Sequence, residues 1–278
     1  MQVSGWLSQA TGTLQATSDS PRLDAELLLM HTLQVSRTWL FTWPDRELSE
    51  SERNVADSLL GRRERGEPMA YITGRREFWS LPLQVNPSTL IPRPDTETLV
   101  EWALELDLPA RSRVLDLGTG TGAIALALAS ERPEWQVIAV DLNACAVELA
   151  RTNARDLELP VDVFQSAWFD SVSGRFDLIV SNPPYIDPDD EHLQQGDVRF
   201  EPASALIAAE AGLADLSHII RSAPEYLEPG GWLLLEHGYD QAQAVCKLLE
   251  QQGFMSVSVR RDLGGQARIS GGVCSSPV

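Results

Sequence analysis

The tetrapeptide Asn182-Pro183-Pro184-Tyr185 combines residue types that could hold a planar nitrogen for chemistry. It directly follows the apolar run Phe176–Ser181, which is typical of a buried strand. Two successive prolines restrict the backbone and lack N–H groups, so the carbonyl oxygens of Asn182 and Pro183 stay available to a ligand. A substrate amino group could donate to the Asn182 side-chain oxygen and the Pro183 carbonyl while Tyr185 stacks on its face. We therefore interpret Asn182, Pro183 and Tyr185 as catalytic, and all four residues as substrate-binding.

A glycine-rich turn earlier in the chain predicts a nucleoside site. It follows the strand-like segment Arg113–Leu117 and precedes an apolar helical stretch. The predicted cofactor-binding residues of this turn are Gly118, Thr119, Gly120, Thr121 and Gly122. Glycines let the backbone pass close beneath a ligand, and the next helix N-terminus presents unpaired N–H groups. About 20 residues further on, Asp141 ends another predicted strand, where its carboxylate can accept both ribose hydroxyls.

The glycine turn alone leaves two cofactor classes open. Gly118, Gly120 and Ala123 also satisfy the G-x-G-x-x-G/A pattern of nicotinamide and flavin enzymes. Asp116 favours a methyltransferase, because a carboxylate suits the cationic amino-acid end of S-adenosylmethionine better than a pyrophosphate. Together with Asn182–Tyr185, the turn indicates methyl transfer from S-adenosylmethionine to nitrogen, with S-adenosylhomocysteine as product. Such catalysis needs positioning and electrostatics, with no metal and no covalent intermediate.

The first part of the chain, residues 1–73, predicts a small helical bundle. Ser20 followed by a proline marks one helix start, and the Ser49/Glu52 capping-box pattern marks another. The first of these helices carries apolar or aromatic residues at helical spacing, namely Leu23, Leu27, Leu28 and His31. Residues 74–94 lose the helical period and predict a linking β-hairpin.

From residue 95 to residue 278, strands and helices alternate. The expected strands are Arg113–Leu117, Gln136–Asp141, Val161–Gln165, Phe176–Ser181, Trp232–His237, Ser256–Asp262 and Gln266–Val273. The expected helices lie at about 95–107, 122–130, 143–157, 210–227 and 239–252. This alternation predicts an α/β domain, with a seven-stranded, mostly parallel sheet covered by helices on both faces in a Rossmann-like arrangement.

Composition restricts the compartment and the partners. The 278 residues carry a net charge of −18, which disfavours direct binding to nucleic acid, because such binding neutralises phosphates with Lys and Arg. The apolar runs are far shorter than the roughly 20 residues that cross a bilayer, and the N-terminus lacks the features of a signal peptide. We expect a cytoplasmic protein without membrane contact. The three cysteines show neither disulfide nor zinc spacing.

The motifs together resemble a known family. The segments that carry the resemblance are Arg75–Phe78, Leu90–Glu97, Gly118–Gly122, Asn182–Tyr185 and Gln195–Pro202. They are similar to the release factor glutamine methyltransferases, the HemK/PrmC family, over essentially the whole chain. Nucleic-acid methyltransferases do not generally share Ile91–Glu97 and Gly196–Pro202. The resemblance implies that the substrate is the Gln of the Gly-Gly-Gln loop of a class 1 peptide chain release factor, methylated on its side-chain amide nitrogen.

The resemblance also implies roles for individual residues. The glycine turn would cradle the methionine end of S-adenosylmethionine, Asp141 would bind ribose, and Trp168 would pack on adenine. Asn182 and Pro183 would accept hydrogen bonds from the substrate amide, and Tyr185 would cover it. The resemblance also places Arg93 and Thr96 over the methionine moiety. Ala167 replaces an acid that relatives often carry, which puts in question a side-chain contact to the adenine amino group but not adenine binding itself.

Two rival functions stay open. A DNA amino-methyltransferase, acting on adenine or cytosine, would explain Asn182–Tyr185 equally well but not the strongly negative charge. A non-enzymatic translation factor is suggested by Gly264-Gly265-Gln266, which we interpret instead as a turn between closing strands. Residues 1–73 carry no chemistry of their own, and we expect them to form a substrate-docking domain.

Overall fold

The computed structural model describes residues 1–194 and 196–275, and these form two compact units. One unit comprises Met1–Arg75 with Gln194–Phe200, and the other comprises Arg76–Leu193 with Glu201–Val278. Gln195, which belongs to a segment that carries the resemblance, lies outside the described residues. The grouping of Gln194–Phe200 with the N-terminal helices is a feature that the sequence analysis did not anticipate.

The first unit is helical, as predicted. Its described helices are α1 (Val3–Leu14), α2 (Pro21–Leu33), α3 (Arg37–Thr42), α4 (Glu50–Glu64), α5 (Met69–Thr73) and the 3-10 helix η3 (Gly196–Phe200). The capping box at the start of α4 is confirmed. Ser49 Oγ accepts from the Glu52 backbone N–H at 3.2 Å, and Glu52 Oε2 accepts from the Ser49 backbone N–H at 2.8 Å. These bonds satisfy two donors that a helix start leaves without intrahelical partners.

The predicted apolar stripe of α2 is wrong in part. Leu28 is fully buried, but Leu23 is 43% exposed, and the acid Glu26 occupies the buried face in its place. Glu26 can be buried because it is paired twice, with Arg22 Nε at 2.7 Å and with Arg37 Nε at 2.8 Å. A buried carboxylate needs such partners, since losing its water otherwise costs several kcal/mol.

The second unit holds two sheets. Its strands are β1 (Arg75–Phe78), β2 (Leu81–Gln84), β3 (Arg113–Leu117), β4 (Gln136–Asp141), β5 (Val161–Gln165), β6 (Phe176–Ser181), β7 (Leu227–Glu236), β8 (Phe254–Arg261) and β9 (Ala267–Cys274). The hairpin β1-β2 is a separate two-stranded sheet, and the other strands form a seven-stranded sheet in the order β5-β4-β3-β6-β7-β9-β8. The pairs from β5 to β7 are parallel, and β9 runs antiparallel to both of its neighbours. The predicted fold is confirmed.

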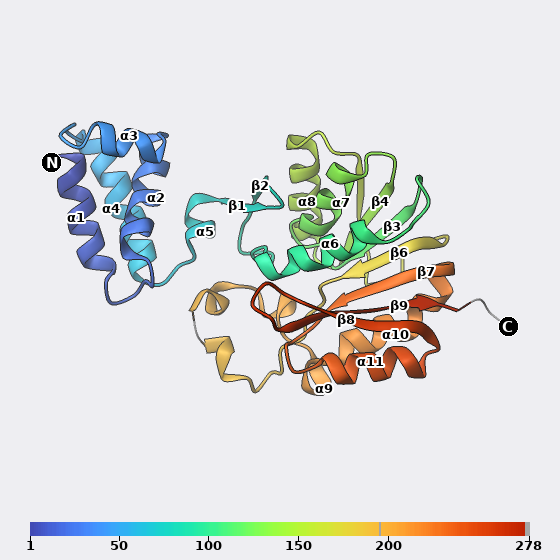
Figure 1. Ribbon diagram of the computed structural model, residues 1–278. Helices are drawn as coiled ribbons and strands as arrows, with labels where there is room; N and C mark the ends of the chain where they lie inside the picture. The colour runs from blue at the N-terminus through green and yellow to red at the C-terminus, as the bar shows by residue number, and fades with distance from the viewer. Residues whose placement is uncertain (195, 276–278) are drawn as a thin grey trace. The chain divides into compact units, whose positions relative to one another are not determined.

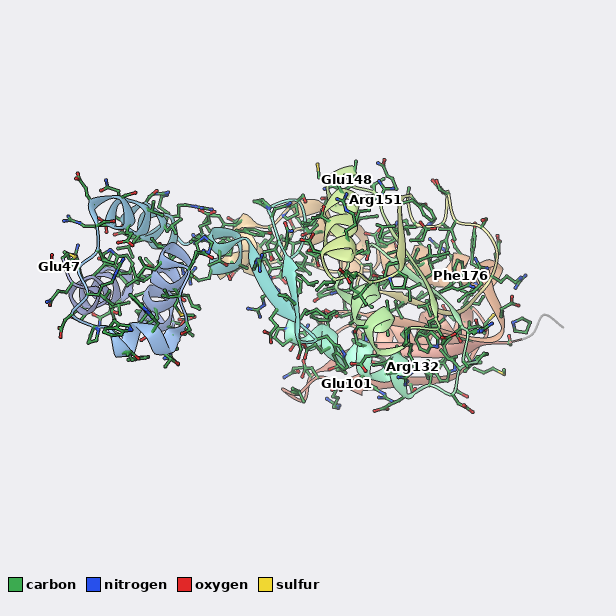
Figure 2. All side chains as sticks on the ribbon, turned by 90° about the horizontal axis from the view of Figure 1, so that it is seen from above. Glu47, Glu101, Arg132, Glu148, Arg151 and Phe176 are labelled. Atoms are coloured by element: carbon green, nitrogen blue, oxygen red, sulfur yellow. The ribbon has the colours of Figure 1, made fainter. Side chains whose placement is uncertain are left out.

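Helices cover both faces of this sheet. The helices of the second unit are α6 (Glu97–Glu105), α7 (Ala123–Glu131), α8 (Ala144–Asp156), α9 (Ala209–Gly212), α10 (Ala214–Tyr226) and α11 (Ala242–Gln251), with the 3-10 helices η1 (Pro94–Thr96), η2 (Glu191–Gln194) and η4 (Ala203–Ala205). One apolar core lies between the sheet and α6, α7 and α8, and another lies between the sheet and α10 and α11 (Figure 1). On the outer side of α8, Figure 2 shows Glu148 and Arg151 next to each other, with Arg151 Nη1 2.6 Å from Glu148 Oε1.

Among the predicted elements, two differ most from the structure. The strand expected to begin at Trp232 is β7, which begins at Leu227, where that residue pairs with Phe176 before an irregularity in the ladder. The helix expected over 210–227 is divided into α9 and α10, because Glu210, Ala211 and Gly212 have left-handed φ angles of +56°, +55° and +79°. The turn at Gly264–Gln266 lies between β8 and β9, as predicted.

Asn153 of α8 connects the hairpin to the glycine turn. Its Oδ1 accepts from the Gln84 backbone N–H at 2.7 Å, and its Nδ2 donates to the carbonyl oxygens of Gln84 at 3.0 Å and Thr121 at 2.8 Å. The side chain is 1% exposed, so water cannot replace these bonds. Asn153 therefore fixes the end of β2 against the turn that carries Thr121.

We expect Asn153→Ala to lower the free energy of unfolding by about 2–3 kcal/mol, because the substitution removes three hydrogen bonds to buried or partly buried backbone groups. Urea unfolding followed by circular dichroism measures this change. Arg155→Ala is the matched control, since Arg155 is exposed on the same helix and should change stability by less than about 0.5 kcal/mol. A loss for Asn153→Ala no larger than that of the control would contradict the structural role.

Candidate functional site

The carboxyl ends of three neighbouring strands meet at one edge of the seven-stranded sheet. The chain leaves β3 toward β4 on one side, whereas β6 lies on the other side of β3, so the edge contains a topological switch point. Ser181 Oγ at the end of β6 donates to the Leu117 carbonyl at the end of β3 at 2.7 Å. This bond holds the two strand ends together immediately before Asn182 and Gly118.

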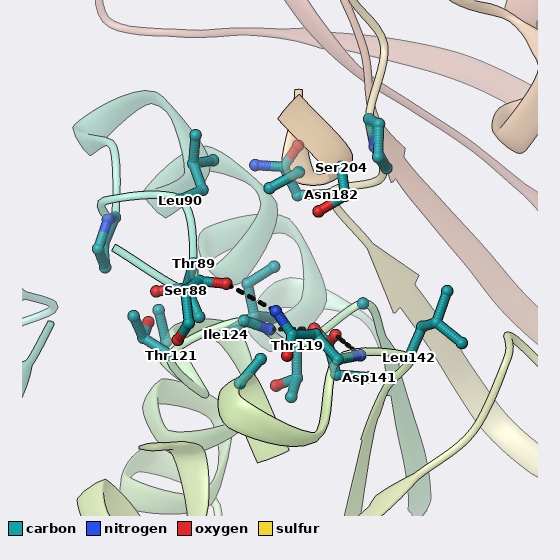
Figure 3. A pocket seen from close by; sticks show the side chains of 18 of the residues that line it. Ser88, Thr89, Leu90, Thr119, Thr121, Ile124, Asp141, Leu142, Asn182 and Ser204 are labelled. Carbon is teal, nitrogen blue, oxygen red and sulfur yellow. Dashed lines mark hydrogen bonds between the residues drawn. The ribbon is translucent and has the colours of Figure 1, made fainter. Parts of the chain in front are cut away.

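A cavity of about 240 Å³ opens at this edge. The sequence-predicted residues that line it are Gly118, Thr119, Gly120, Thr121, Asp141, Trp168, Asn182 and Pro184, together with Arg93 and Thr96. Figure 3 shows Asn182 and Ser204 along one side of the cavity and Thr119 and Asp141 along the opposite side. Gly122, Pro183 and Tyr185 are not among the lining residues. The structure thus brings together most of the nucleoside turn and the Asn182 end of the tetrapeptide.

The glycine turn uses backbone conformations that side chains rarely adopt. Gly118, Gly120 and Gly122 have φ angles of +69°, +56° and +86°. Gly122 is the N-cap of α7 and faces Leu126 and Ala150, so its role is to join the turn to the helix. The alternating glycines keep the cavity side of the turn free of side chains at these positions.

Asp116, whose carboxylate the sequence associates with the cationic end of S-adenosylmethionine, is not among the residues that line the cavity. The side chain is fully buried, and its Oδ2 accepts from Thr119 Oγ1 at 2.6 Å. Burial raises the pKa of Asp116 to about 7. Its observed contact is structural, because it holds the hydroxyl of a residue within the glycine turn.

Asp141 lies at the end of β4 with both carboxylate oxygens toward backbone donors. Oδ2 accepts from the Gly120 N–H at 2.9 Å, and Oδ1 accepts from the Asn143 N–H at 2.8 Å. Burial raises the pKa of Asp141, and these two hydrogen bonds oppose that change by favouring the ionised form. Each oxygen keeps a further lone pair, so the carboxylate can still accept hydrogen bonds from hydroxyl groups of a ligand in the cavity.

Trp168 is held over the start of the glycine turn. A Cβ atom added at Gly118 would lie 3.4 Å from Trp168 Cζ3. The Trp168 backbone has a φ of +48°, and its carbonyl accepts from Ser166 Oγ at 2.9 Å. Burial raises the pKa of Asp215 in the first turn of α10, and the nearby Trp168 side chain opposes this rise. Asp215 lines the cavity as well, and the sequence analysis missed it, because an acid at a helix start has many ordinary uses.

The tetrapeptide presents its residues in different directions. Asn182 lines the cavity, and its Nδ2 donates to Thr96 Oγ1 at 3.3 Å. Tyr185 turns its hydroxyl toward Glu236, with Oη 3.4 Å from Oε1, and burial raises the pKa of this phenol. The Tyr185 carbonyl accepts from Gln241 Nε2 at 3.0 Å.

Gly212 permits this path of the backbone. A Cβ atom at Gly212 would lie 2.1 Å from the Tyr185 carbonyl oxygen, closer than atoms can approach. With its φ of +79°, this position requires glycine for two independent reasons.

Glu201 joins the two segments that are most specific to the resemblance. Its Oε1 accepts from the Ile91 backbone N–H at 2.9 Å, and its Oε2 accepts from Arg93 Nη2 at 2.5 Å. The Glu201 side chain is fully buried, whereas Arg93 also lines the cavity. The ion pair thus fixes the arginine at the cavity wall.

The loop after the hairpin forms part of the cavity wall. Ser88, Thr89, Leu90 and Pro92 line the cavity, and Asn143 Nδ2 donates to the Ser88 carbonyl at 3.2 Å. From the sequence, this stretch is predicted only as part of the linking hairpin over residues 74–94. Only the proximity of Ile91–Glu97 to a cofactor, which the resemblance implied, could have indicated its position.

The described residues were also compared with the requirements of a metal site and of a membrane-spanning helix. Residues 1–194 and 196–275 contain no cluster of three or more His, Cys, Asp or Glu side chains arranged to hold a metal ion. Across the same ranges, the helices are too short or too polar to cross a bilayer. Cys145, Cys246 and Cys274 are free thiols.

Comparisons with known proteins agree with the motifs. The family described as "PrmC N-terminal domain" matches residues 5–74, and the "Methyltransferase small domain" matches residues 95–212. The release factor glutamine methyltransferase of Yersinia pestis is 55% identical over 272 residues, which cover 97% of this chain and 98% of that protein. The protein of the same name from Escherichia coli (strain K12) is 52% identical over 272 residues, again 97% of this chain and 98% of the relative. A crystal structure of a methyltransferase from Pyrococcus furiosus has a TM-score of 0.56 at 18% identity, covers 79% of this chain and 100% of that one, and shows a shared fold. The chain belongs to the release factor glutamine methyltransferase family.

Proposed function

We propose that this protein transfers a methyl group from S-adenosylmethionine to the side-chain amide nitrogen of the Gln in the Gly-Gly-Gln loop of class 1 peptide chain release factors. The observation that carries the proposal is the position of Asn182 at a cavity whose opposite side is a nucleoside-type glycine turn. Family membership supports the choice of protein substrate.

The cavity suits S-adenosylmethionine on three counts. The glycine turn removes side chains where a ligand must approach the backbone, Asp141 offers carboxylate lone pairs to ribose hydroxyls, and Trp168 offers an aromatic face to adenine. Arg93 and Thr96 line the remaining wall near Asn182, where the methionine end would lie. When bound, S-adenosylmethionine supplies an electrophilic methyl group, so the chemistry needs no metal ion.

The tetrapeptide would orient the substrate nitrogen. Asn182 Oδ1 and the Pro183 carbonyl accept the two N–H groups of the glutamine amide, and Tyr185 limits the space over it. An amide nitrogen is a poor nucleophile because its lone pair is delocalised into the carbonyl. The hydrogen bonds to these two acceptors become stronger as positive charge develops on the nitrogen. They therefore stabilise the transition state more than the ground state, which lowers the barrier. The methylated nitrogen then loses one N–H proton to water, which restores a neutral amide, and S-adenosylhomocysteine remains as the other product.

The net charge of the protein bears on which kinds of molecule it can bind. The net charge of −18 argues against a nucleic-acid substrate, which is the main difference from the DNA amino-methyltransferase alternative. We propose a cytoplasmic enzyme that binds neither nucleic acid nor membrane.

Residues 1–73 serve as the substrate-docking domain in this proposal, because a single Gln with its glycine neighbours is too small to select one protein. Standard protein interfaces bury about 800 Å² per partner. The helical unit exposes two large aromatic side chains at the end of α3, Phe41 at 58% and Trp43 at 56%. Aromatic residues of this kind often dominate binding energy at interfaces.

The function can be tested by incubating the enzyme with methyl-labelled S-adenosylmethionine and a purified release factor, with mass spectrometry to locate the label. We expect one methyl group on the Gly-Gly-Gln glutamine. Asn182→Ala should lower turnover by about 10²–10³-fold, because one positioned acceptor is lost, while cofactor affinity stays within a few-fold. Asn54→Ala, at an exposed position of α4, is the matched control. Near-normal turnover of Asn182→Ala would remove this residue from the mechanism.

Asp141→Asn should weaken S-adenosylmethionine binding by about tenfold or more and change the saturated rate much less. Ribose contacts are similar in the ground and transition states, and the new amide group would also turn an N–H toward the backbone donor of Gly120 or Asn143. Titration calorimetry gives the dissociation constant. Asp162→Asn, an exposed acid on the neighbouring β5, should leave it unchanged. An unaltered constant for Asp141→Asn would show that the ribose assignment is incorrect.

The double substitution Phe41→Ala/Trp43→Ala should lower kcat/KM for an intact release factor by about tenfold or more. The same variant should methylate a short Gly-Gly-Gln peptide at the wild-type rate, because a peptide does not reach the docking surface. Steady-state kinetics with both substrates provide the comparison. Equal kcat/KM of variant and wild type for the intact protein would mean that these side chains do not contribute to docking.

A further inference from the structure

We propose that Glu236 is a positioning residue that sets the orientation of the Asn182 side-chain amide through the hydroxyl of Thr96. The inference rests on the proposed function, in which Asn182 Oδ1 accepts from the substrate. Glu236 does not line the cavity, so it acts through other residues and does not touch the substrate.

Glu236 ends β7 and is buried behind the tetrapeptide. It is 1% exposed, and its Oε2 has no hydrogen-bond partner among the residues that the structure describes. Tyr185 Oη lies 3.4 Å from Oε1. Burial raises the pKa of the Glu236 carboxyl group, and the nearby Thr96 side chain opposes that rise. A buried carboxylate with so few partners is costly, so Glu236 is not explained by a contribution to stability.

The direction of the hydrogen bonds determines which end of the Asn182 amide faces the cavity. An ionised carboxylate can only accept, so in this proposal Thr96 donates its one hydroxyl proton to Glu236, whose Oε2 has no other partner among the described residues. Thr96 Oγ1 is then left as an acceptor, and it receives Asn182 Nδ2 at 3.3 Å. With Nδ2 engaged in this way, Oδ1 is the end of the amide that can accept from a substrate N–H.

If Glu236 were protonated, the direction of the hydrogen bonds between Glu236, Thr96 and Asn182 would no longer be fixed. A protonated carboxyl can donate to Thr96 Oγ1, which frees the threonine hydroxyl to donate to Asn182 Oδ1. The Asn182 amide would then rotate and present its N–H2 group to the substrate N–H2 group, where two donors oppose each other. Turnover should therefore require the ionised form of Glu236.

The surroundings of Glu236 make such a change accessible near neutrality. Burial raises the pKa of Glu236 to about 7, and the negative charge of Asp95 acts in the same direction. Hydrogen bonding from Thr96 and Tyr185 and the positive charge of Arg268 on β9 oppose the rise. Because the active form is the ionised one, the rate should increase as the pH rises through about 7.

The experiment compares wild type with Glu236→Gln, which keeps the shape of the side chain but can always donate. Methyl transfer to a purified release factor is measured at saturating S-adenosylmethionine from pH 6 to pH 8.5, and S-adenosylhomocysteine affinity is measured by calorimetry. We expect Glu236→Gln to turn over about 10–100-fold more slowly above pH 7, with a flat pH profile and an affinity within about threefold of wild type. A general loss of structure would instead lower the affinity for S-adenosylhomocysteine. It would not produce a flat pH profile at unchanged affinity.

Two substitutions at Thr96 keep the test decisive if Glu236→Gln folds poorly. Thr96→Ser retains the hydroxyl and should retain the rise of rate with pH, whereas Thr96→Val breaks the connection and should give a slow, flat profile. A wild-type rate and profile in Glu236→Gln or Thr96→Val would overturn the proposal. Asn182→Ala separates this result from a failure of the proposed function, because normal turnover in that variant would contradict the role of Asn182 itself.

Discussion

Parallel pairing of β3 with β4 on one side and with β6 on the other makes three distant chain segments end at the same edge of the sheet. Parallel strands have all their carboxyl ends together, so Gly118, Asp141 and Asn182 become neighbours although 64 positions separate the first from the last. The Ser181 hydroxyl bond to the Leu117 carbonyl ties the two central ends directly. Every proposed role at the cavity depends on this alignment, and a strand displaced by one residue would exchange its buried and exposed side chains.

Burial of carboxyl groups beneath the cavity has an energetic cost. Asp116 and Glu236 have unperturbed pKa values of 3.8 and 4.5, and burial raises both to about 7. A carboxyl whose pKa is raised on folding contributes stability that is fully present below its unfolded pKa and is lost as the pH rises through the folded value. Both groups therefore lower stability at mildly alkaline pH, where the proposed positioning role of Glu236 needs its ionised form. Stability and activity thus have opposite pH requirements at this position.

Features that depend on short stretches of chain were predictable from the sequence. The capping box at Ser49 and Glu52 and the glycine turn before α7 need only neighbours within a few residues, and the alternation of strands and helices indicated the mostly parallel sheet. Glu26 was not predictable as a buried residue, because its partner Arg37 becomes adjacent only after α2 and α3 pack. The contacts of Glu201, Asp215 and Glu236 were not predictable for the same reason. Each is an ordinary acid in the sequence and acquires a specific role only through contacts across the fold.

Asn153 also affects the order in which the protein can fold. Its side chain bonds Gln84, which lies 69 positions earlier, and Glu201 bonds Ile91 across 110 positions. Contacts between such distant residues form slowly, because the intervening chain must first lose its conformational freedom. During synthesis, the N-terminal helices emerge first, and the hairpin with its following loop must wait for α8 and then for Glu201. The cavity is consequently one of the last features of the molecule to be completed, and a nascent chain cannot bind its cofactor until most of the catalytic unit has been made.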